Sequence, residues 1–226
     1  MIVNNFRLNR KTSSEISLIL INVRGLMLNV RMGRPTKENS LSRQDVIEAA
    51  IATIEKEGAS ALGVNRVARE LGIKPPAIYK HLRGNAELKK AVAIAIWKHY
   101  FSELRQKTAE IIDERAFLKA GGIASRDFAR SHPGLYRVMM QFQLQPDDPE
   151  SALIIRESQR LFRVFLGSND ITETKLIDIM RMVNASIVGF IALEQSGLLT
   201  LPRSTDDSFE VMLDALYVAI EHLKKQ

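Results

Sequence analysis

The chain has 226 residues, of which 46% are hydrophobic and 26% are charged, and it carries a net charge of +6. This composition is typical of a globular protein and excludes a disordered or fibrous one. The absence of cysteine excludes disulfides, thiol catalysis and cysteine-bound zinc, and it fits a protein of the reducing cytoplasm. No stretch reaches the roughly 18 to 20 consecutive apolar residues of a transmembrane helix, so the sequence predicts a soluble protein without a membrane partner.

Positive charge is concentrated in the first half of the chain. Residues 1–105 contain 18 lysines and arginines against 9 acidic residues, whereas residues 106–226 contain 14 against 17. This asymmetry favours a polyanionic partner at the front of the protein. Ordinary scatter of surface charge is the alternative interpretation.

Residues 1–31 lack a clean hydrophobic period and come before a better-defined start at Met32. We interpret them as a disordered leader or as an extension upstream of the natural start. An additional helix over 14–24 is the alternative. Gly33-Arg34-Pro35 then predicts a short basic arm, because glycine and proline both disfavour a helix.

The first well-defined helix is predicted to begin after Ser42. Ser42 and Asp45 can form a capping box, in which each side chain accepts a hydrogen bond from the other residue's amide. Gly58 ends this helix as a residue that tolerates a left-handed conformation. A second, short helix covers 64–71, where apolar residues recur at helical spacing, and Gly72 ends it.

A third helix of about seven residues is predicted to open at Pro75, where the missing amide costs nothing. Its inward face holds Ile78 and Leu82, and Asn85 caps a long helix behind it. Two short helices on a glycine turn predict a helix-turn-helix. Small and polar side chains at the start of the second helix suit a DNA major groove, which is about 12 Å wide.

The rest of the chain is predicted to be helical throughout. Apolar residues at helical spacing mark segments that end near Ser131, 146–149 and Gly167, and two long helices follow over 172–196 and 206–225. No segment alternates strictly at the strand period for more than a few residues. The predicted fold class is all-α, with about nine helices.

Residues 32–100 resemble the N-terminal module of TetR-family regulators. The similarity rests on Gly33-Arg34-Pro35, Val67-Ala68-Arg69-Glu70-Leu71-Gly72-Ile73, Ala77-Ile78-Tyr79-Lys80-His81-Leu82 and Leu88. Lys74 departs from the pattern, since many members have a serine or threonine cap there.

The rear half has a weaker resemblance. His132-Pro133-Gly134-Leu135-Tyr136 is similar to the C-terminal domain subtype named for a Trp-His-Gly motif. The corresponding stretch of the penultimate helix, Ser186-Ile187-Val188-Gly189-Phe190, keeps only the glycine.

The resemblance implies a transcriptional regulator that binds a palindromic double-stranded DNA operator as a homodimer. It implies a helix-turn-helix headpiece over 32–85 and a helical effector-binding and dimerisation domain over 86–226. A small-molecule effector would weaken DNA binding, and repression is the family's usual outcome. A constitutive regulator without a ligand is the alternative.

The predicted DNA-binding residues come from the basic arm and the second helix of the helix-turn-helix. The resemblance assigns Tyr79 to a phosphate, against the alternative of a half-buried packing tyrosine. A methyl group at Ala77 can touch a thymine methyl or serve simply as a helix former. Asn85 has capping as its better-supported role. The full predicted set is Arg34, Lys37, Lys74, Ala77, Tyr79, Lys80, His81 and Asn85.

A soft apolar cluster in the rear half predicts an adaptable effector site, with ordinary core packing as the alternative. Its candidate residues are Phe128, Tyr136, Met139, Phe142, Phe162 and Asn184. The two last helices are predicted to pair with a second copy of the chain. The candidate dimer residues are Ile187, Ile191, Leu213, Leu216 and Ile220, which share one stripe on each helix.

Two other classes compete with a DNA-binding regulator. An enzyme is disfavoured, because the four histidines are scattered and the sequence lacks the HExxH, phosphate-loop and Gly-x-Ser-x-Gly motifs. The sequence therefore predicts no catalytic residues, no cofactor and no metal site. A helical module that binds protein through its helix-turn-helix is the second alternative, and salt-dependent binding to duplex DNA would separate the two.

Overall fold

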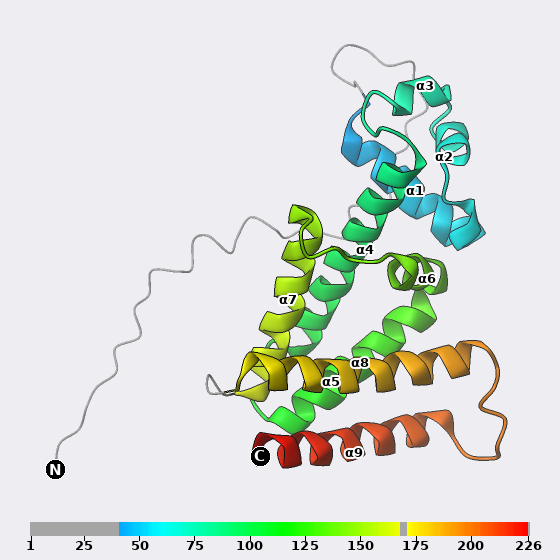
Figure 1. Ribbon diagram of the computed structural model, residues 1–226. Helices are drawn as coiled ribbons and strands as arrows, with labels where there is room; N and C mark the ends of the chain where they lie inside the picture. Colours follow the sequence, from blue (N-terminus) through cyan, green and yellow to red (C-terminus); the bar gives the residue numbers. More distant parts are fainter. Residues whose placement is uncertain (1–40, 168–170, 226) are drawn as a thin grey trace. The chain divides into compact units, whose positions relative to one another are not determined.

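The computed structural model describes residues 41–167 and 171–225, in which helices are joined by turns and loops and no strand occurs (Figure 1). This confirms the predicted all-α class. In chain order the elements are α1 (Arg43–Glu57), the short 3-10 turn η3 (Ala59–Ala61), α2 (Val64–Glu70), α3 (Pro75–Ile78), α4 (Asn85–Thr108), α5 (Glu114–Ser131), α6 (Pro133–Gln141), α7 (Pro149–Leu166), α8 (Glu173–Gln195) and α9 (Thr205–Lys225).

Helix α1 begins at the predicted capping box. The Ser42 side chain accepts a hydrogen bond from the Asp45 amide at 3.1 Å, and the Asp45 carboxylate accepts one from the Ser42 amide at 2.8 Å. Gly58 ends the helix at φ +87°, a backbone region that favours glycine. Both predicted boundaries of α1 are confirmed.

Helix α3 is shorter than the sequence suggests. Regular α-helix covers only Pro75–Ile78, and the chain then continues in turns to Leu82. The Leu82 amide still donates to the Ile78 carbonyl at 3.0 Å. The predicted inward face is therefore kept, with Ile78 and Leu82 both fully buried.

The predicted cap of α4 is wrong. Gly84 occupies the N-cap position without a side-chain hydrogen bond, and Asn85 is already the first helical residue. The Asn85 side-chain oxygen instead accepts from the Val64 amide at 2.9 Å. It thereby satisfies a free donor at the start of α2, which has Gly63 as its own cap and no capping side chain.

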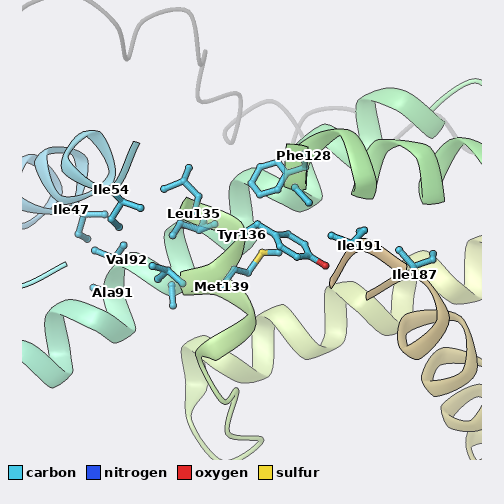
Figure 2. Packing of buried hydrophobic residues seen from close by; sticks show 14 of the residues in the cluster. Ile47, Ile54, Ala91, Val92, Phe128, Leu135, Tyr136, Met139, Ile187 and Ile191 are labelled. Atoms are coloured by element: carbon cyan, nitrogen blue, oxygen red, sulfur yellow. The ribbon is translucent and has the colours of Figure 1, made fainter. Parts of the chain in front are cut away.

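One hydrophobic core joins the N-terminal helices to the bundle behind them. Helix α4 has 24 residues and is therefore about 36 Å long; it runs from α1–α3 into the bundle, where α8 and α9 lie side by side (Figure 1). Figure 2 shows the buried side chains of α1, α4 and α6 continuing toward α8, through Ile54, Val92, Leu135, Met139 and Ile191.

Helix α6 approaches α1 closely at Gly134. A Cβ atom added there would lie 3.0 Å from both the side chain and the carbonyl oxygen of Ile54. Such contacts are tighter than those that most side chains make, so glycine lets α6 approach the backbone of α1 closely. The neighbouring Leu135 is buried in the same core. Helices α6 and α1 therefore pack directly against each other.

Ion pairs add a second connection between α1, α4 and α7. Lys90 of α4 pairs with Asp148 and lies 3.5 Å from Glu150, and Arg43 of α1 lies 4.0 Å from the same Glu150. The hydrogen bond from Lys90 lowers the pKa of Asp148 to about 2, with help from the Ser151 amide. Asp148 also caps α7 through that amide.

Helix α8 is long and apolar enough to cross a membrane by length and composition, in contrast to the sequence expectation. Only 28% of its apolar window is buried inside the described part of the chain. One face of α8 therefore packs in the bundle, and the described part of the chain does not cover a second, weakly polar face.

Candidate DNA-binding surface and ligand cavity

The second helix of the helix-turn-helix presents its predicted polar residues to solvent. Tyr79 is 50% exposed, and Lys74 and Lys80 are exposed beside it. Ala77 and His81 are half-buried. On the opposite side Ile78 and Leu82 are buried in the core, so the predicted inward face is confirmed.

Two predicted contacts, Arg34 and Lys37, lie outside the described residues, as does the whole of 1–31. Asn85 is exposed, but its side-chain oxygen is engaged by the Val64 amide. Its amide nitrogen remains the group that could meet a phosphate.

Arg66 of α2 forms ion pairs with Glu57 of α1 and with Glu70 of its own helix. Its Nε donates to Glu57 at 2.7 Å, and its Nη2 donates to Glu70 at 2.8 Å. The Glu57 hydrogen bond is the main cause of a raised pKa at Arg66, and the same bond lowers the pKa of Glu57. Arg66 therefore supports the helix-turn-helix from behind, while Lys74 and Lys80 supply charge at its surface.

Behind the helix-turn-helix, α4, α5, α6, α7 and α8 enclose a cavity of about 320 Å³. This volume lies at the lower end of the range for small-molecule sites. Its walls are mostly aromatic and aliphatic, and none of the described side chains that line it is charged. The chemistry of the walls therefore suits an uncharged, largely apolar ligand.

A few polar groups interrupt the apolar walls. The Nε1 of Trp97 is buried and has no hydrogen-bond partner. The Tyr100 hydroxyl lies 2.8 Å from Ser125 Oγ, which also donates to the Gly121 carbonyl at 2.8 Å. Burial raises the pKa of Tyr100 and of Tyr136, so both remain neutral phenols. The cavity thus offers hydrogen bonds without offering charge.

The structure brings most of the predicted effector residues together. Tyr136, Met139, Phe142, Phe162 and Asn184 all line the cavity. Tyr136 and Met139 point from α6 toward the Ile187 and Ile191 side of the core in Figure 2. Phe128 is buried in the core at 1% exposure and does not line the cavity.

Sequence reasoning missed the contribution of α4. Trp97, Phe101, Leu104 and Thr108 follow one another at helical spacing on its C-terminal half, and all four line the cavity. The aromatic spacing itself was the available indication of a second buried face.

The five predicted dimer residues lie inside the chain's own bundle. Each is buried to 8% exposure or less in the single chain; they are Ile187, Ile191, Leu213, Leu216 and Ile220. The apolar residues that α8 and α9 expose lie on neighbouring stripes. They include Ala185, Gly189, Ala192 and Leu193 on α8, and Val211, Ala215 and Val218 on α9.

Comparison with known proteins identifies both parts of the chain. Residues 46–92 match the family model described as bacterial regulatory proteins, tetR family. Residues 118–216 match the model described as tetracyclin repressor-like, C-terminal domain. An uncharacterised HTH-type transcriptional regulator of Mycobacterium tuberculosis is 28% identical over 84% of this chain and 85% of its own length.

Solved structures share the whole fold. A TetR variant from Acinetobacter baumannii AYE, in complex with minocycline, has a TM-score of 0.61 and 24% identity, covering 81% of this chain and 98% of its own. ActR from Streptomyces coelicolor, in complex with (S)-DNPA, has a TM-score of 0.63 and 17% identity, covering 81% and 98%. These structures share the fold, and the two matched family models place the chain in the TetR family of DNA-binding transcriptional regulators.

Proposed function

We propose that the protein is a homodimeric repressor that is released from its operator by a small, uncharged, largely apolar ligand. The observation that carries this proposal is the 320 Å³ cavity, because α4 and α6 line it and also contact the N-terminal helices. The related proteins solved with minocycline and with (S)-DNPA support a ligand-binding role for the same fold.

In this proposal the exposed face around α3 contacts DNA. Lys74 and Lys80 meet phosphates, Tyr79 donates its hydroxyl to a phosphate, and Ala77 faces a base edge. His81 adds a phosphate contact at one side. The contacts must lie on an exposed, positively charged face that the core holds rigidly, and the burial of Ile78 and Leu82 provides that support.

Tyr79→Phe and Lys80→Ala are expected to weaken DNA binding without unfolding the protein. Each variant should lower the affinity about tenfold or less, because each removes one hydrogen bond or ion pair to a phosphate. Lys80→Ala should also reduce the slope of log affinity against log salt by about one unit. The measurement is fluorescence anisotropy with a labelled operator, found by searching the DNA that flanks the gene for a palindrome, over a series of salt concentrations.

Lys98→Ala is the matched control, because it removes the same charge from an exposed position on α4 away from α3. It should leave affinity and salt slope unchanged. If Tyr79→Phe and Lys80→Ala both bind like the wild type at equal salt, the face presented by α3 is not the DNA-binding face.

The cavity selects its ligand by shape and hydrogen bonding rather than by charge. A charged ligand would lose its hydration without gaining a counter-charge, which is costly in an apolar site. The unpaired N–H of Trp97 favours a ligand that carries a hydrogen-bond acceptor, because an unsatisfied buried donor is itself unfavourable. The tyrosine hydroxyls add further neutral contacts.

Trp97→Phe is expected to weaken ligand binding about tenfold while leaving the fold intact. The aromatic ring is kept, and only the N–H donor and part of the ring are lost. Trp97 is also the chain's single tryptophan, so ligands of the wild type can be found by the change in its fluorescence. Calorimetry then compares the two proteins with the same compound.

Exposed Leu153→Ala on α7 is the control for that comparison, since Leu153 does not line the cavity. Equal affinity of Trp97→Phe and wild type would remove Trp97 from the ligand contacts. If no uncharged compound that carries an acceptor changes the tryptophan fluorescence, a constitutive regulator without a ligand becomes the better description.

We place the dimer contact on the exposed stripes of α8 and α9. Val211 and Val218 are 56% and 68% exposed, and they are separated by two helical turns. Together with the small residues of α8 they form an apolar face that the single chain does not cover. A second copy that brings the same face would bury it, and a two-fold axis would place two helix-turn-helix units on one palindrome.

A further inference from the structure

Two histidines and a glutamate meet where α4 passes the junction of α5 and α6. His99 and Glu103 lie one turn apart on α4, and His132 is the residue between α5 and α6. One potential metal-ligand atom from each of the three lies within 4.8 Å of the other two. All three side chains are partly buried.

The side chains that contact these three residues also suit a metal site. His132 Nδ1 lies 2.9 Å from Oε1 of Glu55 on α1, which leaves its other ring nitrogen for a ligand. A metal-binding histidine commonly donates its second ring N–H to a carboxylate, which fixes the ring orientation and the tautomer. Both imidazoles also pack against Phe128, with centroid distances of 5.6 and 5.1 Å, so the rings are already oriented.

We propose that His99, Glu103 and His132 bind one divalent transition-metal ion of the zinc class, with Glu55 orienting His132. Two imidazoles and one carboxylate suit such an ion, whereas Mg²⁺ and Ca²⁺ prefer oxygen ligands. Three protein ligands leave a fourth position for water. No sequence motif indicates this site, because His132 lies far along the chain from His99.

The geometry requires only small side-chain movements. Tetrahedral zinc with bonds of about 2.0 to 2.1 Å places neighbouring ligand atoms about 3.3 Å apart. His99 Nε2 and Glu103 Oε1 are already 3.0 Å apart. The other distances between the three ligand atoms are at most 4.8 Å. Side-chain rotation can shorten them to the spacing that zinc requires. The ordinary alternative is two independent ion pairs, His99 with Glu103 and His132 with Glu55.

A bound ion would connect three parts of the fold. It would join α4 to the start of α6, and through Glu55 it would also fix α1 of the helix-turn-helix. This site is separate from the apolar cavity, because none of its residues lines that cavity. The ion would therefore act on the junction between the DNA-binding helices and the bundle independently of the uncharged ligand.

The test is calorimetric titration of the full-length, chelator-treated protein with Zn²⁺. The chain has no cysteine and only four histidines, so competing high-affinity sites are few. We expect one Zn²⁺ per chain and no binding of Mg²⁺ under the same conditions. His99→Gln and His132→Gln should each weaken Zn²⁺ binding at least about 100-fold, and Glu55→Gln should weaken it about 10- to 100-fold.

His222→Gln is the control, since it removes a histidine from the end of α9 and should keep wild-type affinity. Co²⁺ in place of Zn²⁺ should give visible absorption bands that His99→Gln and His132→Gln lose. The histidine variants could lose Zn²⁺ binding through misfolding, whereas Glu55→Gln changes an exposed side chain and should keep the fold. Circular dichroism checks the fold of each variant. If a double variant, His99→Gln with His132→Gln, binds Zn²⁺ as the wild type does, or if the wild type does not bind it, the proposal is wrong.

Discussion

Val211→Glu combined with Val218→Glu is expected to convert the proposed dimer into a folded monomer. Both side chains are mostly exposed in the single chain, so the substitutions leave its own core intact. If this face forms the dimer interface, the two substitutions would bury unpaired carboxylates there, which costs several kcal/mol. We expect the dissociation constant of the dimer to rise at least about a thousandfold, which corresponds to about 4 kcal/mol.

Sedimentation velocity measures this change, and circular dichroism checks the fold. Val164→Glu is the matched control, because Val164 is 62% exposed but lies on α7. It should sediment like the wild type. The monomeric variant should also bind a palindromic operator only as strongly as a single half-site. If the double variant sediments as the wild-type dimer, the interface is not on this stripe.

Glu194→Gln is expected to destabilise the protein by about 2 kcal/mol at neutral pH. Glu194 Oε2 accepts from Arg126 Nε at 3.0 Å, and Oε1 accepts from Arg130 at 2.8 Å. The Arg126 side chain is only 6% exposed, and its guanidinium carbon lies 5.3 Å and 4.7 Å from the ring centroids of Phe190 and Phe209. This loss of stability is smaller than the loss on breaking an isolated buried ion pair, because Asp206, which lies 2.9 Å from Arg126, remains in the variant and partly balances its charge.

The pH dependence follows from the direction of the pKa shift. The hydrogen bond from Arg126 lowers the pKa of Glu194 from 4.5 to about 2, with Arg130 adding to it and desolvation opposing it. The stabilisation is therefore fully present above the ordinary glutamate pKa of 4.5 and is lost as the pH falls toward 2. The difference between wild type and Glu194→Gln should shrink across that window.

Urea unfolding at one fixed protein concentration measures the difference at each pH. Glu210→Gln is the control, because Glu210 is 60% exposed and only 3.6 Å from Lys119. It should change stability by less than about 0.5 kcal/mol. A difference between wild type and Glu194→Gln that stays constant from pH 7 to pH 3, or that is absent at pH 7, would contradict the assigned role of Glu194.

Local chemistry made much of the fold predictable from the sequence. The capping box at Ser42 and the glycine at residue 58 act within a few residues, so their geometry is determined by adjacent side chains. The inward pair Ile78 and Leu82 follows from helical spacing alone. The cavity could be anticipated in part, since α6 carries Tyr136 and Met139 close together.

What the sequence did not predict depends on contacts between distant segments. Asn85 caps α2 rather than α4, because Val64 reaches it only after the helix-turn-helix has folded. Helical spacing identified an apolar stripe on α8 and α9, but both helices have a second, weakly polar stripe. Periodicity cannot tell which of two such stripes faces the chain's own core. The His99 and His132 cluster likewise requires α4 to pass the end of α5.

The most direct test of a ligand-released repressor is the binding of one ligand, identified through Trp97 fluorescence, to the wild-type protein with and without its operator. Linkage requires that DNA weaken ligand binding by the same factor by which the ligand weakens DNA binding. We predict that the ligand's dissociation constant rises about 10- to 100-fold on the operator complex, which corresponds to roughly 1.4 to 2.8 kcal/mol of coupling. Equal ligand affinity for free and operator-bound protein would contradict release by the cavity ligand.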